Sequence, residues 1–132
     1  MRGIKFRAWH KPTQLMDDVA LIDFYNEKIG ILYADPVMQC ESMQKFNFNE
    51  VEIMQYTGLK DKNGQEIYEG DILLGHCVYP EHNIFECKLI GEVYYSSRGT
   101  WDCYSYILGG FNEQVEVTGN IYENPELLEV EE

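Results

Sequence analysis

Apolar and polar side chains alternate with a period of two along much of the chain. The clearest example is the stretch 4–9, Ile-Lys-Phe-Arg-Ala-Trp, and comparable stretches recur as far as residue 118. Such alternation is typical of strands that bury one face. Residues that favour tight turns interrupt it, as in Asn63-Gly64. We therefore expect strands at 4–9, 15–16, 19–25, 29–33, 51–56, 67–74, 90–95, 100–108 and 115–118.

Two stretches depart from this pattern. Residues 37–46 fit a short helix as well as a strand, because their apolar residues can line one helical face. Asn124 precedes Pro125 and an acidic residue, an order typical of the first turn of a helix. The whole pattern predicts a mainly β fold of one or two small barrels, built from short antiparallel strands, with one or two short helices.

The net charge of the 132 residues is −13, and it is unevenly distributed. Residues 1–62 contain eight Lys/Arg and nine Asp/Glu, whereas residues 63–132 contain two Lys/Arg and fourteen Asp/Glu. A negative field attracts cationic partners and repels nucleic acid. The same charge also keeps a protein soluble, so charge alone does not establish a binding function.

The sequence shows no signal for a membrane or a cofactor. No apolar stretch approaches the roughly 20 residues that span a membrane, and polar residues or glycine interrupt the apolar ones at the N-terminus, unlike in a signal peptide. We therefore expect a cytosolic protein whose four cysteines are free thiols. Dinucleotide, P-loop and nucleophile-elbow motifs are absent, and we expect no cofactor.

A group of histidines and cysteines resembles a metal site. It comprises His76, Cys77, His82 and Cys87, with Cys103 as a further candidate. Zinc ligands usually come in pairs two to four residues apart. The gaps here are one, five and five residues. We therefore expect no metal, although the spacing alone leaves open whether this group binds anything.

Carboxylates gather between residues 61 and 71, where Asp61, Glu66, Glu69 and Asp71 surround a turn. A calcium-binding EF-hand loop requires glycine at its sixth position, but counting from Asp61 the glycine falls at the fourth, Gly64. The calcium interpretation therefore fails. A hydrolase that uses these carboxylates as general acid and base stays an alternative.

The N-terminal strand combines basic and aromatic residues: Arg2, Lys5, Phe6, Arg7, Trp9 and Lys11. Such a combination binds single-stranded nucleic acid through phosphate contacts and base stacking. On a strand, however, Phe6 and Trp9 point to opposite faces, so at least one of them belongs to the core. A nucleic-acid-binding barrel is therefore a second alternative.

Three segments carry the most specific pattern of the chain: 4–9, 54–72 and 119–128. In this order and at this spacing they resemble the YopX family of phage and prophage proteins. The resemblance implies a β-rich fold and a phage origin, and it supplies no activity and no catalytic residues. The stretch from Tyr68 to Ile72 also resembles the strand that leads into SH3-like barrels. We expect an N-terminal β-hairpin subdomain at 1–55 and a C-terminal SH3-like barrel subdomain, with a short terminal helix, at 56–132.

Five residues of these segments can line one groove: Tyr56, Asn63, Tyr68, Asn120 and Tyr122. Aromatic faces with amide edges form a recognition surface, although core packing explains the same tyrosines. We expect a phage or prophage accessory protein without enzymatic activity, whose acidic C-terminal half binds a host or phage protein. Homo-oligomerisation is a further expectation, because several short strands leave exposed edges. We expect neither nucleic acid nor a membrane as partner.

Overall fold

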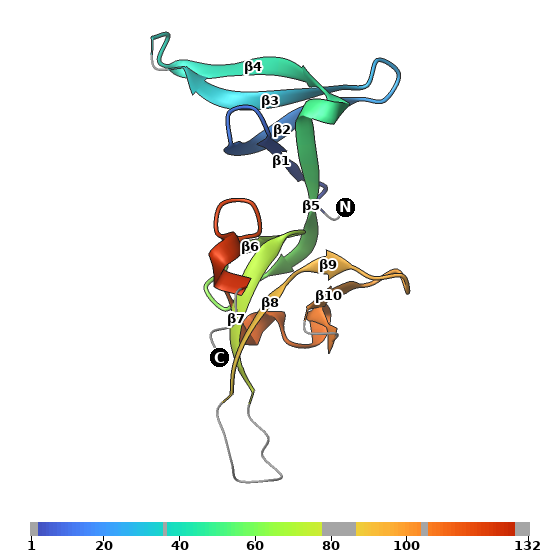
Figure 1. The fold of residues 1–132 in the computed structure, drawn as a ribbon, viewed down its shortest axis with the longest axis vertical. Coiled ribbons are helices and arrows are strands. Elements are labelled where there is room, and N and C mark those ends of the chain that lie inside the picture. Colours follow the sequence, from blue (N-terminus) through green and yellow to red (C-terminus); the bar gives the residue numbers. More distant parts are fainter. Residues whose placement is uncertain (1–2, 36, 78–86, 104–105, 129–132) are drawn as a thin grey trace. The chain divides into compact units, whose positions relative to one another are not determined.

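The computed structural model describes residues 3–35, 37–77, 87–103 and 106–128 (Figure 1). Over these ranges the chain forms twelve strands and four short 3₁₀ helices, and all strand pairs are antiparallel. The predicted mainly β fold with short helices is therefore confirmed. The chain divides into two compact units, Gly3–Gln55 and Tyr56–Glu132.

The first unit begins with a meander of four strands, each paired with the next, and its fifth strand returns to pair with the first. Its elements are β1 (Phe6–His10), β2 (Leu15–Asp23), β3 (Lys28–Asp35), β4 (Cys40–Asn47), η1 (Phe48–Glu50) and the first half of β5 (Val51–Lys60). The three hairpin connections contain Gln14, Glu27 and Gln39, which have φ values of 58°, 53° and 52°. These left-handed conformations close the turns without glycine, at a modest cost in strain.

The core of the first unit lies on one face of this sheet. Ala8, Ile29, Ile31 and Val51 are almost fully buried there. The rings of His10 on β1 and Phe46 on β4 are 4.0 Å apart, although β2 and β3 lie between these strands in the sheet order. The sheet must therefore curl strongly, so that its buried face closes on itself.

The second unit is built from shorter strands. Its elements are the second half of β5, β6 (Glu66–Tyr68), β7 (Asp71–Cys77), β8 (Cys87–Glu92), β9 (Tyr94–Tyr95), β10 (Trp101–Cys103), β11 (Tyr106–Ile107), η2 (Leu108–Gly110), η3 (Asn112–Gln114), β12 (Glu116–Asn120) and η4 (Pro125–Leu128). Its buried core comprises Ile67, Leu73, Val93, Cys103, Leu108 and Val115. η4 is the short terminal helix that Asn124-Pro125 predicted.

The strands form three sheets, and in the part of the chain that the structure describes none of them closes into a barrel. The orders are β4-β3-β2-β1-β5-β6, β11-β10-β9 and β12-β7-β8. The expected small barrels are thus replaced by open sheets. One physical reason is length, since β9 and β11 have two residues each and cannot carry pairing round a closed surface. The SH3-like character of the second unit stays a prediction.

Candidate functional site

The tight turn between β6 and β7 organises the second unit. The Tyr68 N–H donates to Asp71 Oδ2 over 2.7 Å, and Gly70 closes the turn with a φ of 83°. Only 1% of the Asp71 surface is exposed. The backbone of Gly70 also donates to Val93 and accepts from Ile121. This turn therefore joins β6, β7, the start of β9 and the end of β12.

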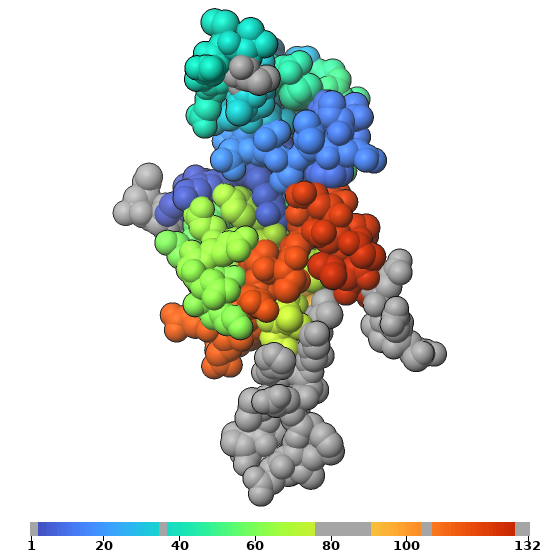
Figure 2. All heavy atoms as spheres, turned by 90° about the vertical axis from the view of Figure 1, so that its left-hand side faces the viewer, coloured from blue at the N-terminus to red at the C-terminus, as the bar shows by residue number. Residues whose placement is uncertain are grey.

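Asn120 holds the segment after β12 against this turn. Asn120 pairs with Asp71 in the strand register, and its Oδ1 accepts hydrogen bonds from the N–H groups of Tyr122 and Glu123 at 3.0 and 2.8 Å. Its Nδ2 donates to the Glu123 carboxylate over 2.9 Å. The segment 121–128, red in Figure 2, consequently lies beside the yellow-green β6 and β7.

Of the five residues predicted to share a groove, four surround this turn. Tyr56 and Tyr68 face each other across β5 and β6, with ring centroids 5.6 Å apart. Asn120 pairs with Asp71, and the N–H group of Tyr122 donates to Asn120. Tyr56 is buried, whereas Tyr68 and Tyr122 are half-buried. The tyrosines thus combine core packing with a partly exposed aromatic surface.

Asn63 belongs to a different turn, between β5 and β6, which Asp61 organises. Asp61 Oδ1 accepts from the N–H groups of Asn63 and Gln65 at 2.8 and 2.9 Å, and Oδ2 accepts from Val117 N–H at 2.9 Å. Burial raises the pKa of this carboxyl group, but the three N–H donors and the nearby Lys62 outweigh burial and lower it. Asp61 therefore attaches the turn to β12 as a carboxylate.

These contacts bear on the hydrolase alternative. Asp61 and Asp71 are both buried, and each accepts hydrogen bonds from backbone N–H groups of its own turn. Both carboxylates are engaged in holding turns, and the N–H donors lower the pKa of Asp61. Their geometry gives no support to acid–base catalysis.

Acidic side chains flank the β6–β7 turn on both sides. Glu69 lies within the turn, Glu92 ends β8 opposite Ile72, and Glu123 follows Asn120. Burial raises the pKa of Glu92, and the negative charge of Glu69 adds to the rise. The two carboxylates are therefore close enough to interact. We call Tyr68, Glu69, Glu92, Tyr122 and Glu123 the acidic turn surface.

The described residues contain no group of three or more histidine, cysteine, aspartate or glutamate side chains that is arranged to hold a metal. Of the histidine and cysteine group, His82 lies outside the described residues. His76, Cys77 and Cys87 are placed only as backbone, on β7 and β8, where Cys77 pairs with Cys87 in the register. Whether this group binds anything stays untested.

The first unit contains a small pocket that sequence reasoning missed. It has a volume of about 170 Å³ and lies on the curled face of the sheet. Its polar lining includes His10, whose Nδ1 is 2.6 Å from Thr13 Oγ1, and Asp17, whose pKa burial raises with a contribution from Asp18. The remaining lining residues are Leu15, Ile31, Tyr33, Gln44 and Phe46. Ligand sites usually measure roughly 300–1,000 Å³, so this pocket suits a single side chain better than a cofactor.

No local sequence signal marks this pocket, because it exists only where the sheet brings β1 and β4 together. The basic residues of the N-terminal strand are also constrained by the fold. Lys11 forms a 3.1 Å salt bridge with Glu52 and donates to the carbonyl oxygen of Asn49. Phe6 and Trp9 are both half-buried. Because of these contacts, Lys11 and the two aromatic rings are less available to phosphates and bases than the sequence indicated.

The sequence model of the YopX protein family matches residues 5–129. The chain belongs to the YopX family. A solved structure, protein EF1440 from Enterococcus faecalis, is 31% identical and is similar over 98% of this chain and 100% of its own, with a TM-score of 0.66. No curated protein matches the sequence. The family membership predicted from the three segments is therefore confirmed, and it brings no established activity with it.

The structure also bears on membrane association. Among the described residues, no helix of this YopX-family chain has the length and apolarity needed to cross a membrane.

Proposed function

We propose that this chain is a non-enzymatic accessory protein of a phage or prophage that binds a cationic segment of a host or phage protein in the bacterial cytosol. The observation that supports it is the acidic turn surface, in which Glu69 and Glu92 interact beside half-buried Tyr68. Carboxylates accept two parallel hydrogen bonds from a guanidinium group, and aromatic faces attract the same cation. The chemistry of the surface therefore fits arginine better than lysine.

The electrostatics of the second unit point the same way. Residues 63–132 contain fourteen Asp/Glu and two Lys/Arg. This excess of negative charge attracts a cationic partner and speeds its association at low salt.

A peptide of alternating arginine and glycine, labelled with a fluorophore, tests the proposal by anisotropy. We expect binding to the full-length protein that weakens as salt rises, because screening shortens the reach of the field to about 8 Å at physiological ionic strength. The triple variant Glu69→Gln, Glu92→Gln, Glu123→Gln should bind about tenfold more weakly, since each exposed ion pair contributes up to about 1 kcal/mol.

The matched control changes the same number of charges elsewhere in the second unit, as Glu66→Gln, Glu113→Gln, Glu116→Gln. This control should bind within about threefold of the unmodified protein, because its charges lie outside the acidic turn surface. If both triple variants bound the peptide equally weakly, net charge alone would account for the binding, and the proposal would be overturned. Duplex DNA bound as tightly as the peptide would favour the nucleic-acid alternative instead.

A further inference from the structure

β4 is an edge strand of unusual regularity. It ends the six-stranded sheet, and in the described part of the chain β3 is its only neighbour in that sheet (Figure 1). All eight residues of β4 pair with β3 without a register shift. β4 contains no proline. A long edge strand without a bulge or a proline presents its outer N–H and C=O groups to any strand that fits.

The side chains of β4 form a charge pattern that complements itself. Glu41, Met43 and Lys45 alternate along one face of the strand, and all three are exposed. Two β4 strands that pair antiparallel about Met43 place each Glu41 opposite the Lys45 of the second copy, twice in one interface. Shifting this register by one or two residues separates both pairs. Opposite charges that face each other across strands stabilise pairing, and like charges oppose it.

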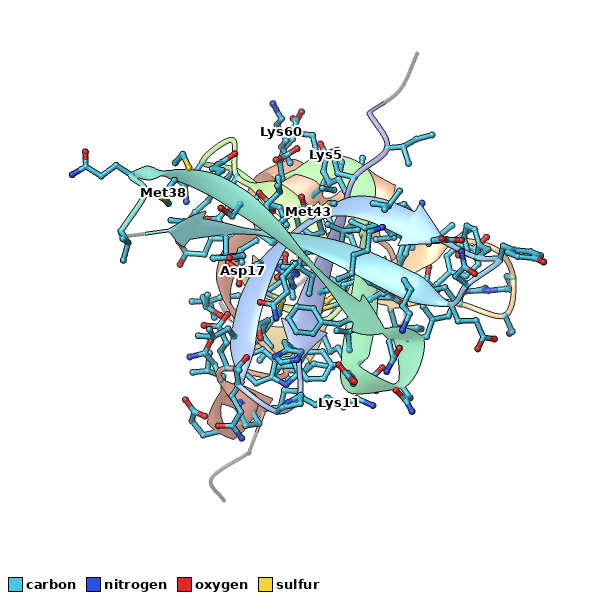
Figure 3. All side chains as sticks on the ribbon, turned by 90° about the horizontal axis from the view of Figure 1, so that it is seen from above. Lys5, Lys11, Asp17, Met38, Met43 and Lys60 are labelled. Carbon is cyan, nitrogen blue, oxygen red and sulfur yellow. The ribbon has the colours of Figure 1, made fainter. Side chains whose placement is uncertain are left out.

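The remaining side chains also fit this register. On the same face Met43 lies over Gly30, where an added Cβ would stand 2.7 Å from its sulfur and 3.0 Å from the Cβ of Leu21. Met43 and Leu21 thus form an apolar stripe across β2, β3 and β4, and 46% of Met43 is exposed at its end. Figure 3 looks onto β4 and labels Met43. A second copy would extend the stripe through its own Met43 and cover the exposed end.

We propose that two copies of this chain associate through their β4 strands, antiparallel and centred on Met43, into one continuous sheet. This interface includes no residue of the acidic turn surface, so its test does not depend on the proposed cationic partner. The two Glu41–Lys45 pairs set the register, and the two Met43 side chains meet at the dyad.

Charge reversal tests the interface through the mass measured by sedimentation equilibrium at physiological salt. The unmodified protein should be dimeric. The single variants Glu41→Lys and Lys45→Glu should each raise the dissociation constant of the dimer at least about tenfold, because two attractive pairs become two repulsive ones. The double variant, and an equimolar mixture of the two single variants, restore both attractive pairs and should be dimeric again.

A disulfide tests the register. Directly opposed residues of paired strands have Cα atoms about 4.5–5.5 Å apart, which suits a disulfide. Met43→Cys in a Cys40→Ser background should therefore form a dimer under mild oxidation, whereas Cys40→Ser alone should not. A monomeric unmodified protein, single variants that stay dimeric, or a dimer that Met43→Cys fails to cross-link would each overturn the proposal. Circular dichroism identical to that of the unmodified protein establishes that a monomeric variant is folded.

Discussion

Replacing Asp61 by asparagine should destabilise the second unit although it changes a single side-chain atom. The carboxylate accepts three backbone N–H groups, two at Oδ1 from Asn63 and Gln65 and one at Oδ2 from Val117. An amide has one acceptor oxygen and an NH₂ group that only donates. Whichever way the new amide turns, at least one backbone N–H faces another donor in a site where Asp61 is 4% exposed.

The expected magnitude follows from these contacts. A buried donor left without a partner costs about 1–3 kcal/mol, and hydrogen bonds to a charged group contribute somewhat more than neutral ones. We expect Asp61→Asn to lower the free energy of unfolding by about 2–4 kcal/mol at pH 7. In a chain of this size that corresponds to a fall in melting temperature on the order of 10 °C.

The effect should depend on pH with a defined sign. The pKa of Asp61 in the folded protein lies below its ordinary value of 3.8. The stabilisation is therefore complete above about pH 4–5 and is lost as the pH falls through the folded pKa. Protonated aspartic acid resembles asparagine, since one of its oxygens then donates. The difference in stability between the unmodified protein and Asp61→Asn should be constant from pH 7 to pH 5 and shrink below about pH 4.

The assay is unfolding in urea, which is monitored by circular dichroism and by the fluorescence of Trp101 in a Trp9→Phe background. Trp101 packs against the core of the second unit and stacks edge-on with Tyr95 at 4.9 Å, so it reports on the unit that contains Asp61. The exposed Asp18→Asn variant is the matched control and should change stability by less than about 0.5 kcal/mol. Equal stability of Asp61→Asn and the unmodified protein at pH 7, or a difference that persists unchanged to pH 3, would refute the reasoning.

Two further predictions concern Gly119 and metal. Gly119→Ala should lower the free energy of unfolding by about 1–3 kcal/mol, because its new Cβ would overlap the Asn124 side chain, whose own Cβ would lie 2.9 Å away. Gly109→Ala, where nothing lies within 4 Å of the new Cβ, is the control, and equal melting temperatures of the two variants would contradict the prediction. The protein should melt at the same temperature with and without a chelator, and stoichiometric zinc in the purified protein would show that this expectation is wrong.

The local structure of this chain could be predicted from its sequence because its signals are local. The alternation in residues 4–9 predicts β1, and Asn63-Gly64 predicts the turn that precedes β6. Asn124-Pro125 predicts η4 in the same way, since capping and a fixed proline φ act within one turn. The family resemblance added the fold class, because it used segments spread over the whole length.

The arrangement of these elements could not be predicted in the same way. Residues 37–46 fit a helix and a strand equally, and the choice of strand depends on β3, whose Gly30 accommodates Met43. The pocket around His10 depends on how far the sheet curls, which no stretch of sequence encodes by itself. The prediction of a barrel was wrong because closure depends on strand length and stagger across the whole sheet, and a periodic pattern specifies neither.

The segments that resemble the YopX family turn out to be those that hold backbone together. Asp61 fixes one turn to β12, Gly70 joins strands on both sides of β7, and Asn120 secures the segment before η4. Residues with such roles identify a fold, because replacing them costs stability whatever the protein binds. Glu92 and the whole of β4 lie outside those segments. A family match on the architectural residues therefore leaves function open, and the two surfaces that bear on it must be tested on this chain itself.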